Sequence, residues 1–425
     1  MDFNAIFAVA VFLIVIALVM SEKVHRSLVA IGGAAVLLLA HVMTLDQAVA
    51  HVDFNTIGVL FGMMLFVAVV KQSGMFGYLA IKTAHIAKGD PWHIMVMYVL
   101  LTAVLSALLD NVTTVLLIGP MTLTVCRLLE VDPVQFFLAE IMASNIGGTA
   151  TLIGDPPNIM IGSAAGLTFF DFVAVDTPVV IVILGAFISV LYVLYGRRLT
   201  VTPERQAAVM ALSERAEIKS EGRLRISVVM LVLVTLGFML HGQLHIESCV
   251  VALGAAGAIL LVSRRNIEHS LAQVEWTTLT FFAGLFIIVG ALSETGTISL
   301  VADALINVTG GDTFLTMLVL LFGSAVISAF LDNIPFVATM IPILLSMAAT
   351  GMDVTPLWWA VSLGVCLGGN GTLIGASANV VLADIAKREG YELTFARFFK
   401  IGFPIMLLTV AISAAYLVLR FGMPL

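Results

Sequence analysis

Long apolar runs recur from one end of this chain to the other, and each is long enough to cross a membrane as a helix. Of the 425 residues, 60% are hydrophobic and only 11% are charged, and the mean hydropathy is +1.11. Such a chain has too little polar surface to dissolve as a globule. The runs are too long and too uniformly apolar for the alternating strands of an outer-membrane barrel. The sequence therefore predicts an all-α polytopic membrane protein.

Ten crossing segments and two further apolar segments can be delimited. The two further segments, 93–127 and 313–348, begin and end on the same side of the membrane. The crossings are expected at about 5–20, 28–42, 56–70, 136–163, 177–196, 226–241, 248–263, 277–292, 357–383 and 402–420. Because the first run follows Met-Asp-Phe-Asn rather than a basic segment, we expect a retained helix and not a cleaved signal peptide.

The charges orient these segments. With the N-terminus outside, all of the 20 Lys and Arg residues except Arg420 fall in cytoplasmic segments. The outside loops are expected to carry acidic residues, namely Asp46, Asp53, Asp171, Asp176, Asp303 and Asp312. This distribution follows the retention of basic loops in the cytoplasm. It predicts a multi-pass protein of the cytoplasmic membrane, with the charged stretch 197–225 as a cytoplasmic linker.

The sequence contains two copies of one unit. Ser106-Ala-Leu-Leu-Asp110-Asn111 returns 222 positions later as Ser328-Ala-Phe-Leu-Asp332-Asn333, and Thr151-Leu-Ile-Gly154 returns as Thr372-Leu-Ile-Gly375. Five crossings separate equivalent helices, so the second copy is inverted, as in alternating-access transporters. The expected organisation is an N-terminal helix and loop (1–27), a first repeat (28–196), the linker (197–225), a connecting helix (226–247) and a second repeat (248–420).

The repeated Asp-Asn pair predicts either a re-entrant hairpin or two full crossings in each copy. The hairpin is favoured, because full crossings would leave the pair at a surface turn. The pair divides segment 93–127 into two helical stretches that are barely long enough to span the hydrocarbon. In a hairpin, Asp110 and Asn111 stand at the start of the returning helix near the bilayer midplane, and Asp332 and Asn333 do the same from the opposite side. These residues are good helix caps, but a carboxylate placed twice within lipid is costly unless it has a function.

A second motif predicts an interrupted helix in each repeat. Pro156 and Pro157 lack N–H donors, and Gly147, Gly148 and Gly154 permit non-helical backbone. Unwound backbone at membrane depth is tolerated where it lines protein or a watered cavity, so polar groups at the breaks are candidate binding residues. Together with the two Asp-Asn pairs, the candidates are Asn145, Thr149, Thr151, Asp155 and Asn158 in the first repeat and Asn370, Thr372, Ser377 and Asn379 in the second.

The two copies differ in charge, since Asp155 aligns with Ala376. Carboxylates gathered in one site cannot all be ionised cheaply, so Asp110, Asp332 and Asp155 are candidate carriers of protons or of a cation such as Na⁺. Asp155 can alternatively cap its half-helix. Cys126, Cys249 and Cys366 share no metal-binding spacing, and neither a structural metal nor a cofactor is expected.

These motifs resemble the ion transporter superfamily, in the branch of arsenite permeases, NhaD-type sodium/proton antiporters and the melanosomal P protein, with its citrate-transporter-like domain. The strings that carry the likeness are Leu109-Asp110-Asn111, Asn145–Asn158, Leu331-Asp332-Asn333 and Gly368–Thr372. The resemblance implies an elevator, in which residues 93–163 and 313–383 move against a scaffold that a second copy can join as a homodimer. Dicarboxylate symporters of the superfamily carry Ser-Asn-Thr at the hairpin tips, and Asp-Asn replaces that motif here.

The leading hypothesis is export of arsenite, antimonite or sodium in exchange for protons. Two alternatives remain open: sodium- or proton-coupled transport of a small anion or carboxylate, and a passive chloride pathway. An enzyme is not expected, since the chain has no His-Glu-x-x-His, serine elbow or Walker loop. The expected partners are the lipid bilayer, the solute and its coupling ion, without nucleic acid.

Overall fold

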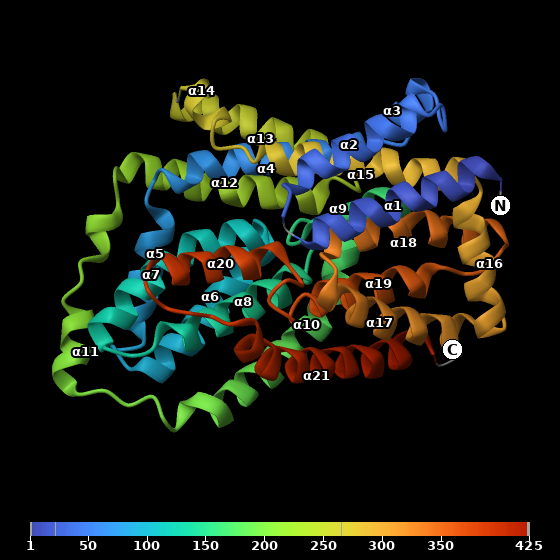
Figure 1. The fold of residues 1–425 in the computed structure, drawn as a ribbon. Coiled ribbons are helices and arrows are strands. Elements are labelled where there is room, and N and C mark those ends of the chain that lie inside the picture. The colour runs from blue at the N-terminus through green and yellow to red at the C-terminus, as the bar shows by residue number, and fades with distance from the viewer. Residues whose placement is uncertain (1, 22, 265, 423–425) are drawn as a thin grey trace.

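The structure, a computed structural model, describes residues 2–21, 23–264 and 266–422, and it is helical without a strand over these residues (Figure 1). Nine of the described helices are long and apolar enough to cross a membrane. The all-α polytopic prediction is confirmed. The elements are α1 (Phe3–Ser21), α2 (Arg26–Leu39), α3 (Leu45–Ala50), α4 (Phe54–Lys71), α5 (Met75–Ile86), α6 (Pro91–Leu108), α7 (Asn111–Leu129), α8 (Pro133–Gly148), α9 (Pro156–Ala165), α10 (Phe169–Leu191), η1 (Tyr192–Gly196), α11 (Pro203–Met210), η2 (Glu214–Glu217), α12 (Glu221–Leu240), α13 (Ser248–Ser263), α14 (Ile267–Leu271), α15 (Trp276–Glu294), α16 (Thr297–Thr309), α17 (Thr313–Phe330), α18 (Asn333–Ala349), α19 (Thr355–Gly368), α20 (Ser377–Arg388) and α21 (Phe395–Phe421).

The helices follow the same order twice. From α2 to α10 the chain forms a long helix, a short helix, two further helices, a hairpin, an interrupted helix and a closing helix, and α13 to α21 repeat this series. The hairpins are α6–α7 and α17–α18, and the interrupted helices are α8/α9 and α19/α20. In Figure 1 the two hairpins lie on opposite sides of the centre of the molecule, and their connecting turns point toward each other.

The outer layer of the fold is built across the two repeats. Helix α2 packs on α15, and α13 packs on α4, so the first helix of each repeat packs on the third helix of the other. Glycines permit this close approach: a Cβ on Gly62 would lie 2.6 Å from the backbone of Ala252, and a Cβ on Gly284 would lie 2.7 Å from the backbone of Ala30. Small residues at such contacts are the usual means of bringing membrane helices together.

Several of the helices outside this layer form a second body. Hairpin helix α6 packs on α8 and α17 packs on α19, while α7 contacts α20 and α18 contacts α9. Helix α10 packs on α8 and α21, and α21 also packs on α17 and α19. The hairpins, the interrupted helices, α10 and α21 are therefore one packed unit, called here the hairpin unit.

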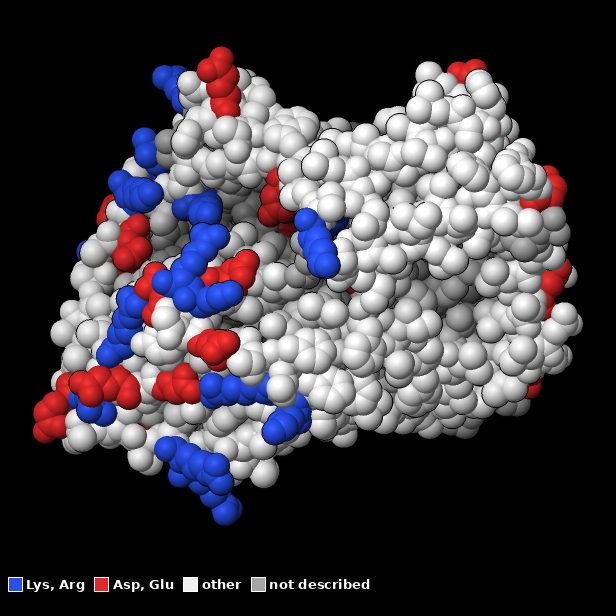
Figure 2. Space-filling view, in the orientation of Figure 1, with Lys and Arg blue, Asp and Glu red and all other residues white. Residues whose placement is uncertain are grey.

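Charge is distributed along one axis of the molecule. Figure 2 shows Lys and Arg gathered over the left-hand end, where Figure 1 places α5 and α11, whereas the right-hand edge of this face carries acidic side chains. The linker 197–225 contains α11 and η2 before α12 begins at Glu221. The linker helix α11 and the clustered basic residues therefore lie at the same end of the molecule, and the cytoplasmic placement of that end stays a prediction.

Two acidic residues that were expected in an outside loop, Asp171 and Asp176, lie within helix α10 instead. This helix begins at Phe169, and Asp176 is fully buried within it. Hydropathy missed the first two turns of α10 because Asp171 and Asp176 lower the local average. The polar start of this helix therefore belongs to the protein interior.

Candidate functional site

The two hairpin tips are built alike. Asp110 is the N-cap of α7 and accepts a hydrogen bond of 2.7 Å from the backbone N–H of Thr113. Asp332 is the N-cap of α18 and accepts one of 3.1 Å from the backbone N–H of Ile334. Both aspartates thus perform the capping role that their residue type favours. Each has a second oxygen for another partner.

The two helix breaks are closed by equivalent side chains. The Thr151 hydroxyl donates to the carbonyl of Ala107, and the Thr372 hydroxyl donates to the carbonyl of Ala329, which ties each break to its own hairpin. Asn158 Nδ2 spans the first break by donating to the carbonyls of Thr149 (3.2 Å) and Thr151 (3.0 Å).

Asn379 spans the second break in the same way. Its Nδ2 donates to the carbonyls of Gly369 (2.7 Å) and Thr372 (2.9 Å). The carbonyls freed by unwinding are therefore paired within the protein, as the absence of bulk water requires. Threonine and asparagine at these positions hold the breaks in shape.

Glycine allows the hairpins to lie directly on the interrupted helices. A Cβ on Gly147 would come within 2.2 Å of the carbonyl oxygen of Ala103, and a Cβ on Gly368 within 2.6 Å of the carbonyl oxygen of Ala325. The same construction in both repeats shows that the duplicated glycines serve packing.

Asparagines connect the two halves at the centre. Asn111 Nδ2 donates to Asn145 Oδ1 at 3.2 Å, and Asn145 Nδ2 contacts both Asn370 Oδ1 (2.9 Å) and Asn379 Oδ1 (3.1 Å). All four side chains are buried. They form a polar core that fixes the first hairpin tip and both breaks relative to one another.

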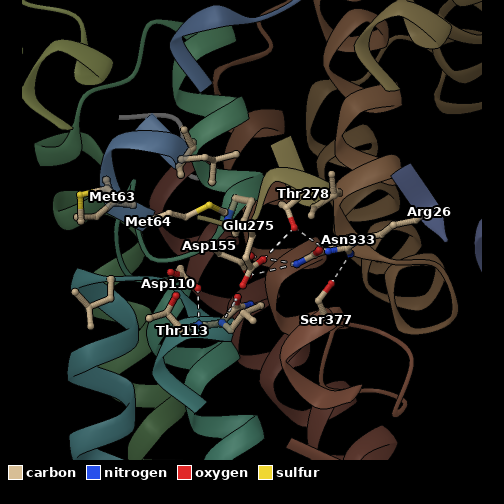
Figure 3. Close-up of a pocket in the computed structure, with 18 residues that line it drawn as sticks. Arg26, Met63, Met64, Asp110, Thr113, Asp155, Glu275, Thr278, Asn333 and Ser377 are labelled. Atoms are coloured by element: carbon tan, nitrogen blue, oxygen red, sulfur yellow. Dashed lines mark hydrogen bonds between the residues drawn. The ribbon is translucent and has the colours of Figure 1, made fainter. Parts of the chain in front are cut away.

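A small cavity lies between the tips (Figure 3). Asp110, Asn111, Asp155 and Asn333 line it, and its volume is about 40 Å³. A buried water needs roughly 10–15 Å³ of such volume, so the cavity holds about three waters. The tips of both hairpins and the first break therefore meet at one small space, where these polar side chains stand among apolar ones such as Met63 and Ile153.

Asp155 is the most unusual group in this cavity. It occupies the N-cap position of α9, yet its side chain makes no capping hydrogen bond. Instead its carboxylate accepts from Asn333 Nδ2 at 3.2 Å, and in Figure 3 it lies between Asp110 and Asn333. The residue is 1% exposed. The expectation that Asp155 caps its half-helix is therefore wrong, and its carboxylate faces the other repeat.

Asp332, in contrast, is turned toward a basic residue. Arg26 Nη1 lies 3.3 Å from Asp332 Oδ2 and 2.8 Å from Ser377 Oγ, while Nη2 donates to Thr278 Oγ1 at 3.2 Å. The guanidinium also stacks over the ring of Phe281. Arg26 thereby links α2 and α15 of the outer layer to α18 and α20 of the hairpin unit.

The first repeat has no such basic partner at the equivalent place. At the repeat offset of 222, the position equivalent to Arg26 is Ser248, whose hydroxyl donates to Asn55 Oδ1 at 3.2 Å. A second, larger cavity of about 500 Å³ adjoins the Asp332 side and is lined by Arg26, Asp332, Ser377 and Asp384. The two repeats thus present an acidic half-site at Asp110 and a neutralised one at Asp332.

The structure separates the thirteen sequence candidates into three groups. Those that line the small cavity are Asp110, Asn111, Asp155, Asn333 and Ser377. Asp332 lines the larger cavity, which Ser377 also borders. Those that instead bond one another or the backbone of the breaks are Asn145, Thr149, Thr151, Asn158, Asn370, Thr372 and Asn379.

Sequence reasoning missed several residues that border the cavity: Arg26, Met63, Met64, Thr113, Glu275 and Thr278. Glu275 is the repeat equivalent of Asp53, and its Oε2 accepts from Thr278 Oγ1 at 3.0 Å. The alignment of the repeats was the one signal that could have drawn attention to it. In the described part of the chain no three His, Cys, Asp or Glu side chains are placed to hold a metal ion together.

Comparison with known proteins places the chain in a family. A family model described as "Citrate transporter" (CitMHS) matches residues 16–364. The chain belongs to this family. Within it, the chain is 46% identical to "Uncharacterized transporter Rv2684" of Mycobacterium tuberculosis over 424 residues, which cover 98% of this chain and 99% of that protein. It is 42% identical to a 46 kDa membrane protein of Mycobacterium leprae, with the same coverage of both chains.

More distant relatives agree with this assignment. The human P protein is 34% identical over 96% of this chain, and the match spans 59% of the P protein. The crystal structure of the YdaH transporter of Alcanivorax borkumensis superposes on this chain with a TM-score of 0.63 and 15% sequence identity. The match spans 100% of this chain and 99% of the YdaH chain. The resemblance to the ion transporter superfamily and to the P protein is confirmed, and the citrate transporter family member described here is a transporter.

Proposed function

We propose that this citrate transporter family member is a secondary active transporter that exports a small inorganic solute, arsenite or antimonite or else sodium, in exchange for protons. The observation that carries the proposal is the carboxylate of Asp155, which makes no capping hydrogen bond and lines the same small cavity as Asp110 between the two hairpin tips. Two acidic groups held together in a small space can exchange a proton for a cation. They can also donate hydrogen bonds to a hydroxylated solute and accept hydrogen bonds from it.

The size and charge of the cavity favour a small solute. Organic ligands usually occupy pockets of about 300–1,000 Å³, whereas this cavity has about 40 Å³. Three acidic residues, Asp110, Asp155 and Glu275, border it with one basic residue, Arg26. Close approach of a multiply charged carboxylate to these groups would be repulsive.

Carboxylate transport is the second candidate, and Arg26 is the observation in its favour. A guanidinium is the preferred protein group for binding a carboxylate, and Arg26 borders both the small cavity and the 500 Å³ cavity beside it. In that case the carboxylate would displace Asp332 from Arg26 on the side of the larger cavity.

The proposed mechanism is an elevator. The hairpin unit, with residues 93–163 and 313–383 at its centre, would slide against the outer layer. The packing of α10 on α8 and of α21 on α17 and α19 supports their moving with it. Arg26 would act as a latch, because it joins α2 of the outer layer to Asp332 of the hairpin unit. The exposed apolar faces of α1, α12 and α13 are suited to contact lipid or a second copy.

The test is solute exchange in proteoliposomes with an imposed pH gradient. Arsenite, antimonite, sodium, lithium, citrate and succinate would each be offered, with proton flux recorded by an internal pH dye. We expect exchange with arsenite, antimonite or sodium, and its loss in the D110N and D155N proteins. Asp303, an exposed residue of α16, provides the matched control in D303N, which should transport at the wild-type rate.

Three results would count against the proposal. Citrate or succinate uptake coupled to protons, without a response to the inorganic solutes, would favour the carboxylate alternative. A chloride current that follows the voltage in the absence of any ion gradient would favour a passive pathway. Proton exchange at the wild-type rate in D110N and D155N would remove the role assigned to these aspartates.

A further inference from the structure

A buried carboxyl group lies outside the cavity described above. Asp176 of α10 is 0% exposed, and Ser362 of α19 lies 2.9 Å from its Oδ2. Its other oxygen, Oδ1, has no hydrogen-bond partner. Among the ion pairs found between described residues, none includes Asp176. An ionised carboxylate in these surroundings would be buried without an ion-pair partner, which is very costly.

Hydrogen counting indicates that this carboxyl group carries a proton. Ser362 Oγ lies 2.8 Å from Asn158 Oδ1 as well as 2.9 Å from Asp176 Oδ2. Both of these atoms are acceptors when Asp176 is ionised, but a serine hydroxyl has a single hydrogen to donate. Both contacts are satisfied if Asp176 donates its proton to Ser362 and Ser362 donates to Asn158.

The chain of contacts ends at the first helix break. Asn158 receives the Ser362 hydrogen at Oδ1 and uses Nδ2 to hold the carbonyls of Thr149 and Thr151. Thr177, the neighbour of Asp176 on α10, donates its hydroxyl to the carbonyl of Ala150 at 2.8 Å. Helix α10 therefore contacts the unwound segment directly at Thr177 and through Ser362 at Asp176.

The other titratable groups near α10 have their own contacts. Tyr416 donates to the carbonyl of Val175 at 2.7 Å, and Arg420 donates to the Tyr416 hydroxyl at 2.9 Å. The titratable or charged groups on the elements packed against α10 are Glu140 on α8, Tyr192 and Tyr195 on η1, Glu221, Arg223 and Arg225 on α12 with His241 at its end, Cys366 on α19, and Arg397, Lys400, Tyr416 and Arg420 on α21.

We propose that Asp176 is a proton-binding site of the hairpin unit, separate from the cavity at the hairpin tips, and that its proton fixes Asn158 across the first helix break through Ser362. When the proton leaves, Ser362 turns its hydrogen to the Asp176 carboxylate. Asn158 Oδ1 then keeps only the weak donor Cys366 Sγ, which lies 3.4 Å away. Loss of the Asp176 proton thereby loosens the support of the break.

The buried thiol of Cys366 provides a reporter for this change. In a protein with Cys126 and Cys249 replaced by alanine, Cys366 is the only thiol, and its labelling by a membrane-permeant maleimide measures the opening of the segment around Asn158. The labelling rate should increase between pH 6 and pH 9 in both proteins. We expect the increase to be about five times larger in the protein with Asp176 than in the same protein carrying D176N. A factor of about five is the population change that corresponds to one hydrogen bond.

Two further variants control the experiment. Glu140 is also buried with one unpartnered oxygen, but its other oxygen contacts Thr122 and not the break, so E140Q should retain the full response to pH. S362A removes the hydroxyl that connects Asp176 to Asn158. Adding D176N to S362A should therefore not change the labelling further. A titration of the purified proteins should show that D176N binds about one proton fewer than the background protein.

Equal labelling of the background and D176N proteins at every pH, or an unchanged proton count in D176N, would overturn the inference. So would an equal loss of the response in E140Q, because that result would show a general effect of buried charge. No transported solute is needed for either measurement. Failure of the arsenite or sodium exchange assay would therefore leave this test unaffected.

Discussion

The ion pair between Arg26 and Asp332 is predicted to hold the outer layer and the hairpin unit together in this conformation. The two side chains are only 28% and 16% exposed, which limits solvent screening. The perturbation is a pair of substitutions, R26A and D332N, made separately and together. K23A, which alters an exposed lysine just before α2, provides a matched control for the loss of a nearby positive charge.

The structure gives the expected size of each effect. A hydrogen bond between charged partners contributes about 2 kcal/mol, and those from the guanidinium to Ser377 and Thr278 contribute about 1 kcal/mol each. R26A should therefore lower the free energy of unfolding by about 4 kcal/mol. The coupling between Arg26 and Asp332 in the double-mutant cycle should be about 2 kcal/mol, which is about a thirtyfold change in an equilibrium.

The assay is denaturant unfolding of the purified proteins in mixed micelles, with the midpoint and the slope both recorded. The double variant should be less destabilised than the sum of the single variants by the coupling energy. A coupling below about 0.5 kcal/mol lies within the scatter expected for independent sites. That result would refute the latch, because it would show that the contact is not maintained in the membrane protein in solution.

Further predictions concern the packing of the hairpins. G147A should lower the free energy of unfolding by about 3 kcal/mol, because the new Cβ would meet the Ala103 carbonyl. The control is G257A, at a position where a Cβ would have no atom within 4 Å, and it should be neutral or slightly stabilising in the same denaturant assay. T151V should cost about 2 kcal/mol, because it leaves the half-buried Ala107 carbonyl without its hydrogen-bond donor. A cost below about 0.5 kcal/mol for either G147A or T151V would contradict the role given to it. The second repeat should respond alike at Gly368 and Thr372.

Much of the architecture follows from patterns that are local or periodic in the sequence. The apolar runs predicted the helices, and the repeated Asp-Asn and Gly-Gly motifs predicted the two hairpins and the two interrupted helices. The repetition itself indicated the inversion, since it needs only a count of the crossings between equivalent positions. These features depend on backbone constraints that any chain of this composition must satisfy in lipid.

The partners of individual side chains were harder to predict. Asp110 and Asp332 look identical in the sequence, but Asp332 contacts Arg26, which is 306 residues away and lies in a stretch that the charge pattern assigned to a cytoplasmic loop. The polar residues of the breaks were predicted to bind solute, whereas Thr151 and Asn158 bond the backbone. The hydrogen-bond partner of a side chain depends on which groups the fold brings within about 3 Å of it. Residue type alone does not determine that partner.

The exchange of partners in the outer layer has a consequence for biogenesis. Because α4 packs on α13 and α2 packs on α15, the first half of the polypeptide leaves the ribosome with the packing surfaces of α2 and α4 uncovered. It must persist in the membrane until translation of the second half is complete. Two separately encoded halves, divided within residues 197–225 and synthesised together, should therefore rescue one another, whereas either half alone should be a substrate for membrane proteolysis.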